Sequence, residues 1–437
     1  MDKIPPHPPV RRTPAYSWAF ALFVALLFPL YSQSALENAL NALPGVRVER
    51  APAAVDGIGE WELSIEQPLD HDGERGTFRQ RLILRHVAQD RPAVLVTEGY
   101  AIGGMRGELS RRLDANELVV EHRYFGTSRP DSLDWRFLTI RQAAADHHRV
   151  LKAFRPLYRG PWVSTGISKG GQTALFYRYY YPDDVAATVA YVAPLPLGQE
   201  DPRLQDFVQR QGSDSCRAAI RAFQRALLTR RAEILPLLDD YAAVKTYSYA
   251  GVGRARALDY AALEFPFAFW QLSSGDCAAI PDSGATAAEL FAYLKGMNYL
   301  YLYDDDVIRN YHPAFYQFMT ELGYYGYDTT AVAGLLSGGA PPANRDFGPP
   351  EADLAYRDGY MAGIVEWLRR HGDRIIYIYG AQDSWSGAAM TLPERGGPAA
   401  AVMMVEGGWH NVRISSMSAA QQARLDSLLG AWVAESR

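Results

Sequence analysis

Ser168 lies in the stretch Ser-Thr-Gly-Ile-Ser-Lys-Gly-Gly at residues 164–171, directly after a β-rich run at residues 162–165. The spacing Gly166-x-Ser168-x-Gly170 is typical of a nucleophile elbow, in which a serine occupies a sharp turn between a strand and a helix. Both glycines are needed there, because a Cβ at either position would clash with the neighbouring strand and helix. We therefore expect Ser168 to be a nucleophile and residues 172–181 to form the helix.

A serine hydroxyl attacks a carbonyl only when a histidine accepts its proton and a carboxylate orients that histidine. In the α/β-hydrolase order the acid and then the histidine follow the serine in the chain. Asp383 comes shortly after a predicted strand at residues 374–379, and His410 follows another at residues 401–405. Loops at the carboxyl ends of parallel strands are where such a sheet gathers its chemistry, so these two residues are the expected partners of Ser168.

Other interpretations of these residues stay open. Asp383 would also serve as a solvated loop acid or as a helix N-cap, and His410 as a loop histidine without a partner. His122 is the strongest rival base, because it also ends a predicted strand, although it precedes Ser168 in the chain. The other histidines fall in early strands, on a helix, in a helical region or at a helix end: His71, His86, His147, His148, His312 and His371.

Acyl transfer also needs two hydrogen-bond donors for the oxyanion that forms on the attacked carbonyl. The backbone N–H of Lys169, the residue after the serine, is one expected donor. The other is expected from the loop that follows the predicted strand at residues 93–97, and we choose the N–H of Tyr100. We expect the side chain of Lys169 itself to be exposed on its helix.

Glu98 stands next to this oxyanion loop, where a carboxylate is chemically unusual unless it meets a positive charge. The free amino terminus of a peptide substrate would supply that charge. The alternative is an internal salt bridge to an arginine such as Arg123.

The elements that must position these residues alternate from about residue 60. Expected strands cover residues 61–67, 77–86, 93–97, 117–120, 162–165, 185–192, 374–379 and 401–405, and expected helices cover 138–154, 353–370 and 416–434. Such alternation predicts an α/β fold with a mostly parallel sheet, which begins with an antiparallel pair. Residues 197–345 show helical periodicity instead and predict an inserted helical cap, so that residues 35–196 and 346–437 form the two parts of the core.

The amino terminus carries Lys3, Arg11 and Arg12, then an apolar stretch at residues 18–30, then small residues at 32 and 34. This pattern is typical of a secretory signal peptide, with cleavage near Ser34, so we expect export to the periplasm or the medium. A retained membrane anchor is the alternative, but the stretch is short for a span of roughly 20 residues. No other segment predicts a membrane span.

Composition narrows the partners further. The 437 residues are 48% hydrophobic and carry a formal net charge of −5, without a basic run that would indicate nucleic-acid binding. The two cysteines, Cys216 and Cys277, predict a disulfide in an exported protein, with two buried thiols as the alternative. Neither a metal site nor a cofactor is indicated by any cluster of ligands or motif.

Several stretches beyond the elbow resemble a known family. They are residues 66–71 (Glu-Gln-Pro-Leu-Asp-His), 76–81 (Gly-Thr-Phe-Arg-Gln-Arg), 97–100 (Thr-Glu-Gly-Tyr), 121–128 (Glu-His-Arg-Tyr-Phe-Gly-Thr-Ser), 166–171 (Gly-Ile-Ser-Lys-Gly-Gly), 181–185 (Tyr-Pro-Asp-Asp-Val), 191–194 (Tyr-Val-Ala-Pro) and 263–271 (Leu-Glu-Phe-Pro-Phe-Ala-Phe-Trp-Gln). Together they look like the secreted tripeptidyl aminopeptidases of bacteria, which are serine peptidases often active on proline-containing peptides. A more distant similarity is to lysosomal prolyl carboxypeptidase and dipeptidyl peptidases.

The resemblance implies an α/β-hydrolase core with a cap, the triad Ser168, Asp383 and His410, and release of short units from free peptide amino termini. It implies no cofactor, and it leaves the subsite preference and the oligomeric state open. Two other functions stay as alternatives. An esterase or lipase would use the same triad without regard to the substrate's amino terminus, and a non-catalytic binding protein would keep only the fold.

Overall fold

The computed structural model describes residues 35–55, 58–104, 106–272 and 275–436. The predicted signal peptide, residues 1–34, lies outside this range. A single nine-stranded sheet runs through the molecule in the order β1-β2-β3-β5-β4-β6-β7-β8-β9. Its strands are β1 (Val46–Val55), β2 (Ile58–Pro68), β3 (Thr77–His86), β4 (Ala93–Thr97), β5 (Asn116–Val120), β6 (Trp162–Ile167), β7 (Ala187–Tyr191), β8 (Ile375–Gly380) and β9 (Ala401–Val405).

The sheet has an antiparallel edge and a parallel centre. Strands β1, β2, β3 and β5 pair antiparallel, whereas the pairs from β5 through β4, β6, β7 and β8 to β9 are all parallel. Every residue of β5, β7 and β8 is buried. Strands covered on both faces need such continuous burial, which is why they appear in the sequence as apolar runs without alternation.

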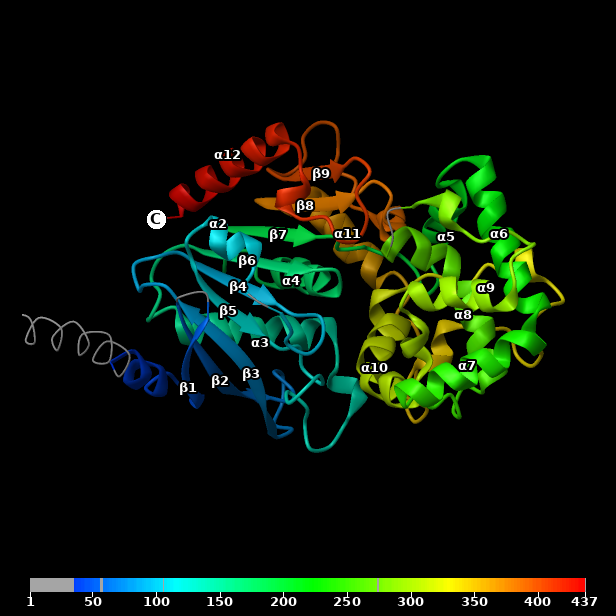
Figure 1. Cartoon of the computed structure of the whole chain (residues 1–437). Coiled ribbons are helices and arrows are strands. Elements are labelled where there is room, and N and C mark those ends of the chain that lie inside the picture. Colours follow the sequence, from blue (N-terminus) through cyan, green and yellow to red (C-terminus); the bar gives the residue numbers. More distant parts are fainter. Residues whose placement is uncertain (1–34, 56–57, 105, 273–274, 437) are drawn as a thin grey trace, which may run out of the picture.

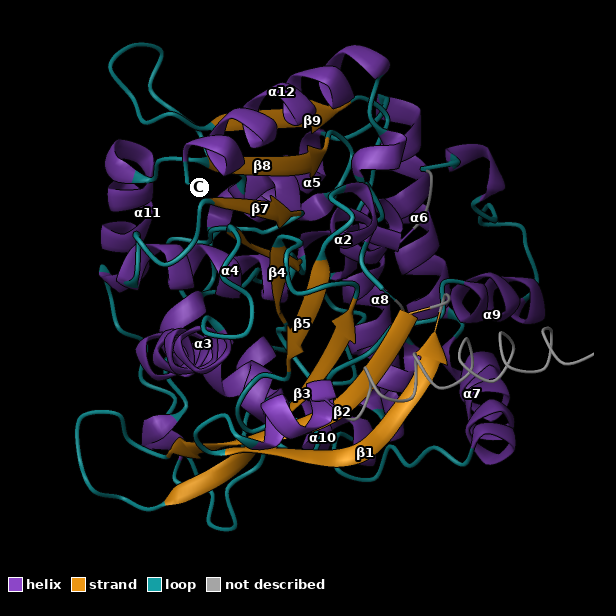
Figure 2. Ribbon diagram, turned by 90° about the vertical axis from the view of Figure 1, so that its left-hand side faces the viewer, coloured by secondary structure: helices purple, strands orange, loops and turns teal. Residues whose placement is uncertain are grey.

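Helices cover both faces of this sheet (Figure 2). On one face lie α3 (Ile140–Phe154), α4 (Lys169–Tyr180) and α11 (Tyr360–His371), and on the other lie α2 (Glu108–Arg112) and α12 (Ala419–Glu435). Leu425 and Leu429 of α12 pack in one core with Ile376 and Ile378 of β8. The predicted α/β-hydrolase architecture with its mostly parallel sheet is confirmed.

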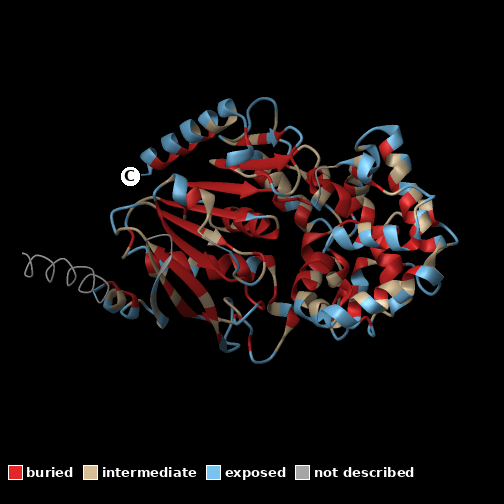
Figure 3. Cartoon of the chain, in the orientation of Figure 1, coloured by how far each residue is buried: buried red, intermediate tan, exposed pale blue. Residues whose placement is uncertain are grey.

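A group of helices, here called the helical block, lies beside the end of the sheet toward which the arrow of β7 points (Figure 1). It comprises α5 (Pro202–Arg210), α6 (Asp214–Thr229), α7 (Arg231–Lys245), α8 (Arg254–Leu272), α9 (Ala287–Gly296) and α10 (Asp305–Gln317). Its buried centre is separate from the sheet and includes Phe223, Leu258 and Phe265 (Figure 3). Residues 35–41 are also helical. Shorter helical segments are η1 (Trp135–Phe137), η2 (Cys277–Ala279), η3 (Leu300–Tyr303), the π-helical η4 (Phe318–Leu322), η5 (Thr330–Val332), η6 (Asn344–Phe347), η7 (Ser384–Ala388) and η8 (Ile414–Ser416).

Strand β1 and helix α11 differ from the expectation. Strand β1 was not predicted, because its apolar alternation is interrupted by the sequence Ala-Pro-Ala-Ala at residues 51–54, which only an edge strand tolerates. The helix expected from residue 353 begins at Tyr360 instead. Gly359 before it has the left-handed φ of 77°, a conformation that cannot continue a helix backwards.

A disulfide joins Cys216 of α6 to Cys277 of η2, with the two Cα atoms 5.2 Å apart. The cross-link closes a loop of 61 residues within the helical block. Replacing both cysteines by serine is expected to destabilise the protein by about 3 to 4 kcal/mol, because the unfolded chain regains the freedom of that loop. A clear fall of the thermal midpoint in calorimetry would bear this out, and an unchanged midpoint would contradict it.

Candidate active site

The elbow at Ser168 is built by a close contact between a strand and a helix. Ser168 joins β6 to α4 with φ 56° and ψ −124°, a backbone conformation that non-glycine residues rarely adopt. A Cβ on Gly166 would overlap the carbonyl of Gly170, and a Cβ on Gly170 would lie 2.6 Å from the Thr97 oxygen. These contacts explain why the two flanking residues are glycines. The Ser168 N–H donates to Tyr191 O at 2.8 Å, which ties the turn to β7.

Asp383 and His410 meet directly. His410 Nδ1 lies 2.7 Å from Asp383 Oδ2, and the Asp383 side chain is fully buried. The second carboxylate oxygen, Oδ1, accepts a hydrogen bond from the Trp385 N–H at 3.2 Å, so Asp383 is also the N-cap of η7. The N-cap alternative and the His410 partnership therefore hold together, one through each oxygen. Among the described residues His410 Nε2 has no hydrogen-bond partner, so this ring nitrogen is the one available for proton transfer.

Backbone hydrogen bonds hold the two loops against each other. Ala381 N donates to Val405 O at 2.9 Å, and Gln382 N donates to Gly408 O at 2.8 Å. Only β7 separates β6, which carries Ser168, from β8, so the two strand ends are about 10 Å apart. Between the described residues no direct hydrogen bond links the side chains of Ser168 and His410. Such bonds are often long in a free enzyme and tighten when substrate binds.

The rival base His122 is buried close to Lys169. It is buried, its Nδ1 lies 2.8 Å from Arg123 O, and burial together with the charge of Lys169 holds its pKa well below the usual value. Two further histidines pair with carboxylates, which the sequence did not indicate: His71 with Asp146 at 2.7 Å and His148 with Asp184 at 2.6 Å. Neither pair is next to a serine elbow.

The two expected oxyanion donors lie on segments that pack together. Gly99 is so close to the elbow that an added Cβ would lie 2.6 Å from Gly170 N. Within the described residues, neither the N–H of Lys169 nor that of Tyr100 donates to a protein acceptor. Unpaired N–H groups beside a serine are what an oxyanion site requires.

The expectation that the Lys169 side chain is exposed is wrong. Only 3% of the residue is accessible, and its Nζ donates to Gly99 O at 2.8 Å. The reason is that α4 is covered all round, with every residue from Lys169 to Arg178 buried. A lysine on such a helix has no route to solvent.

Glu98 is half-buried at the start of the oxyanion loop. In the described part of the chain its carboxylate has no hydrogen bond or ion pair. Burial, reinforced by the negative charges of Glu117 and Glu121 and only partly opposed by the positive charge of Arg85, raises its pKa to about 7. A carboxylate in this state would be stabilised by a cationic partner.

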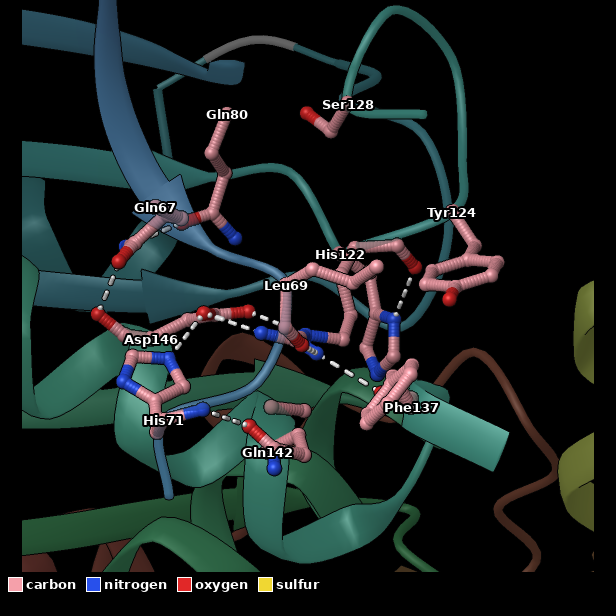
Figure 4. A network of polar contacts seen from close by, with 12 residues as sticks. Gln67, Leu69, His71, Gln80, His122, Tyr124, Ser128, Phe137, Gln142 and Asp146 are labelled. Atoms are coloured by element: carbon pink, nitrogen blue, oxygen red, sulfur yellow. Dashed lines mark hydrogen bonds and ion pairs between the residues drawn. The ribbon is translucent and has the colours of Figure 1, made fainter. Parts of the chain in front are cut away.

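The alternative partner for Glu98, Arg123, is engaged elsewhere. Its guanidinium donates to both carboxylate oxygens of Asp146 at 2.7 Å and to the carbonyls of Leu69 and Phe137. Figure 4 shows Leu69, Phe137 and Asp146, whose oxygens accept from the Arg123 guanidinium, and it shows His71 next to Asp146. The salt bridge between Glu98 and Arg123 is therefore not formed.

An aromatic cluster that the sequence did not reveal connects the helical block with the Asp383 loop. The Trp385 ring lies 4.9 Å from that of Phe267 and 5.1 Å from that of Tyr324, measured between centroids. Ser384 Oγ donates to Phe267 O at 2.6 Å. The available signals were the aromatic stretch at residues 265–270 and Trp385 two residues after Asp383, but neither indicates that the two segments meet.

Comparison with known proteins identifies the family of this chain. Residues 34–436 match the family described as PS-10 peptidase S37. The prolyl tri/tetrapeptidyl aminopeptidase of Streptomyces mobaraensis is 33% identical over 412 residues, which cover 92% of this chain and 85% of that protein. Human lysosomal Pro-X carboxypeptidase is 29% identical over 199 residues, 40% of each chain.

Among solved structures, the proline iminopeptidase of Mycobacterium smegmatis aligns with a TM-score of 0.42 and 14% identity, covering 86% of this chain and all of that one. The family match, in contrast, spans nearly the whole described chain and includes the elbow and both loops that carry Asp383 and His410. The chain therefore belongs to the PS-10 peptidase S37 family, and it is a serine peptidase.

Proposed function

We propose that this protein is an exported exopeptidase that releases tripeptides from free peptide amino termini, with Ser168, His410 and Asp383 as its catalytic triad. The observation that carries the proposal is that the Ser168 elbow and the hydrogen-bonded pair of His410 and Asp383 all follow the carboxyl ends of parallel strands in one sheet. The Streptomyces relative is named a prolyl tri/tetrapeptidyl aminopeptidase, which supports the release of short units from peptide amino termini.

Each residue has one task in the proposed reaction. Ser168 Oγ attacks the scissile carbonyl while His410 Nε2 takes its proton, and Asp383 stabilises the imidazolium that forms. The tetrahedral intermediate collapses when His410 returns the proton to the leaving amine, which leaves an acyl-enzyme. Water then attacks the acyl group with the same base, releasing the amino-terminal product and Ser168. The N–H groups of Lys169 and Tyr100 bind the oxyanion in both halves.

Glu98 is the proposed anchor of the substrate amino terminus. It is the first residue after β4, two residues before the proposed oxyanion donor Tyr100. Among the described residues it forms no ion pair, and the attraction of Arg85 is weaker than the opposing effects of burial, Glu117 and Glu121. The positive charge of a substrate ammonium group beside Glu98 would offset the repulsion from Glu117 and Glu121. Selectivity for unblocked peptides follows from the cost of leaving this half-buried carboxylate unpaired.

Glu98→Gln is expected to lower kcat/KM for substrates with a free amino terminus by about 10- to 100-fold, the equivalent of one charge-assisted hydrogen bond. Acetylated substrates should lose little. Glu66→Gln, which removes an exposed carboxylate on β2, is the matched control and should change neither value. Equal losses for free and acetylated substrates would remove Glu98 from this role.

The preference for substrates with a free amino terminus should also depend on pH. The Glu98 carboxyl has a pKa raised to about 7, so it is neutral below that pH and charged above it. The preference for free over acetylated substrate should therefore fall as the pH drops from about 7 to about 5.5, a range in which the α-amino group, with a pKa of about 7.7 to 8.0, is mostly protonated. Taking the ratio of the two substrates cancels every pH dependence that both substrates share. In Glu98→Gln the ratio should not change with pH.

Proline selectivity is assigned to the aromatic cluster of Phe267, Tyr324 and Trp385 next to Asp383. Flat rings favour a rigid apolar ring such as that of proline at the bond to be cut. The helical block, which supplies Phe267, acts as a cap that admits peptides and excludes folded proteins. Mass spectrometry of digests of peptides beginning Ala-Ala-Pro should show the released tripeptide, and release of single residues or of internal fragments would overturn the proposal.

Export is supported by the disulfide, because such bonds persist in oxidising compartments. Within the described residues no helix is long and apolar enough to span a bilayer. The residues 1–34 would then be the removed signal peptide, with the mature protein in the periplasm or the medium. Amino-terminal sequencing of protein recovered from outside the cytoplasm tests this directly.

A further inference from the structure

Lys169 carries a buried amine beside the reacting serine, and the proposed mechanism uses only its backbone. Its side chain is covered by the surrounding protein, and Nζ lies 5.4 Å from the centre of the Tyr100 ring and 5.3 Å from that of Phe125. Burial lowers the pKa of the amine well below its usual value. Within the described residues it has no carboxylate partner. Burying an amine without such a partner lowers the stability of the fold. The hydrogen bond from Nζ to Gly99 O therefore points to a function for this side chain.

That hydrogen bond reaches the peptide unit that carries the other oxyanion donor. Lys169 Nζ donates to Gly99 O at 2.8 Å, and the carbonyl of Gly99 belongs to the same planar peptide as the N–H of Tyr100. In a trans peptide the C=O and N–H bonds point in opposite directions. A donor fixed at Gly99 O therefore fixes the direction of the Tyr100 N–H.

The hydrogen bond from Lys169 Nζ to Gly99 O also strengthens the Tyr100 N–H as a donor. Hydrogen bonds in a chain polarise one another, so a donor at the carbonyl oxygen makes the N–H of the same peptide a better donor. The nearby aromatic faces of Tyr100 and Phe125 favour a positive charge on Nζ. Both protonation states of the amine retain an N–H for Gly99 O.

We propose that the Lys169 side chain is a positioning residue for the oxyanion hole, which links the donor on the elbow to the donor on the loop after β4. One residue then supplies the first donor through its backbone N–H and aligns the second through its side-chain amine. The close approach of Gly99 to the elbow, which leaves no room for a Cβ, lets Nζ reach across. This inference rests on the proposed acyl-transfer mechanism, but not on the proposed peptide specificity.

Lys169→Met tests the role, because methionine fills a similar volume without the donor. The expected result is a fall in kcat of about 100-fold for a chromogenic amide, with KM changed less than threefold, since an oxyanion donor acts mainly in the transition state. Affinity for a peptide boronate, which forms a tetrahedral adduct with the serine, should fall in parallel. Affinity for the tripeptide product should not change.

Thr173→Val is the matched control, because it removes another buried hydrogen bond on the same helix, from Thr173 Oγ1 to Lys169 O at 2.9 Å. It should lower the thermal midpoint as much as Lys169→Met does but leave kcat near that of the wild type. If Lys169→Met does not fold, Lys169→Gln serves instead, with the same expected division between kcat and KM. A loss confined to KM, or an unchanged boronate affinity, would overturn the proposal.

Labelling with a fluorophosphonate separates this inference from the proposed function. The reagent phosphonylates an activated serine without requiring a peptide, and the reaction also uses the oxyanion hole. Failure of the wild type to react would contradict the acyl-transfer mechanism. Fast labelling of the wild type and equally fast labelling of Lys169→Met would contradict only the role of Lys169, whereas about 100-fold slower labelling would support it.

Discussion

Ser168→Ala is expected to lower kcat for a tripeptide amide by about 10⁶-fold, with the folded protein intact. Alanine lacks the nucleophile, so no acyl-enzyme forms, and the remaining turnover reflects only binding and the oxyanion donors. Strain at this position should remain, because the backbone conformation with φ 56° is imposed by the packing of β6 against α4. The variant should therefore be as stable as the wild type.

Stopped assays with purified protein at high concentration measure this residual rate, and fluorophosphonate labelling supplies a second readout. Calorimetry checks the fold. A variant that keeps more than about one hundredth of the activity would show that another nucleophile carries the reaction, because triad nucleophiles contribute far more than that.

Asp383→Asn should lower kcat by about 10⁴-fold while keeping the local structure, by analogy with the loss of the orienting aspartate in other triads. The structure gives a specific reason. Asp383 Oδ1 accepts from the Trp385 N–H, so the single oxygen of asparagine will keep that acceptor position. Its NH₂ group then faces His410 Nδ1, which forces the proton onto Nε2, and a protonated Nε2 cannot accept the proton of Ser168.

This prediction is open to a direct check, because nuclear magnetic resonance of labelled histidine distinguishes the two tautomers. A shift of the His410 proton from Nδ1 to Nε2 should accompany the loss of kcat. A fall of less than tenfold, with the tautomer unchanged, would show that the contact of 2.7 Å between Asp383 and His410 has no catalytic role.

The sheet and the loops that carry Ser168, Asp383 and His410 were predictable, because they depend on local signals. Apolar runs mark the buried strands, and the glycine spacing at Gly166 and Gly170 follows from contacts within one turn. The pairing of Asp383 with His410 followed from their positions after consecutive parallel strands. Family resemblance added the expected function but no contact that the strand order had not already indicated.

What could not be predicted depends on contacts between distant segments. The exposure of Lys169 was misjudged because the sequence does not reveal that α4 is covered on every side. The partner of Arg123 was uncertain because Asp146, on α3, looks like any other helix acid until the fold places it beside the guanidinium. Likewise, Phe267 and Trp385 are in contact although they lie far apart in the sequence.

The most direct test of the central claim compares Ala-Ala-Pro-p-nitroanilide with its N-acetylated form on the wild-type enzyme at about pH 7.5. We expect kcat/KM for the free amine to exceed that for the acetylated substrate by about 100-fold or more, because blocking leaves the Glu98 carboxylate unpaired in a half-buried site. Equal turnover of the two substrates would contradict an exopeptidase that binds the amino terminus, and would indicate a hydrolase indifferent to it.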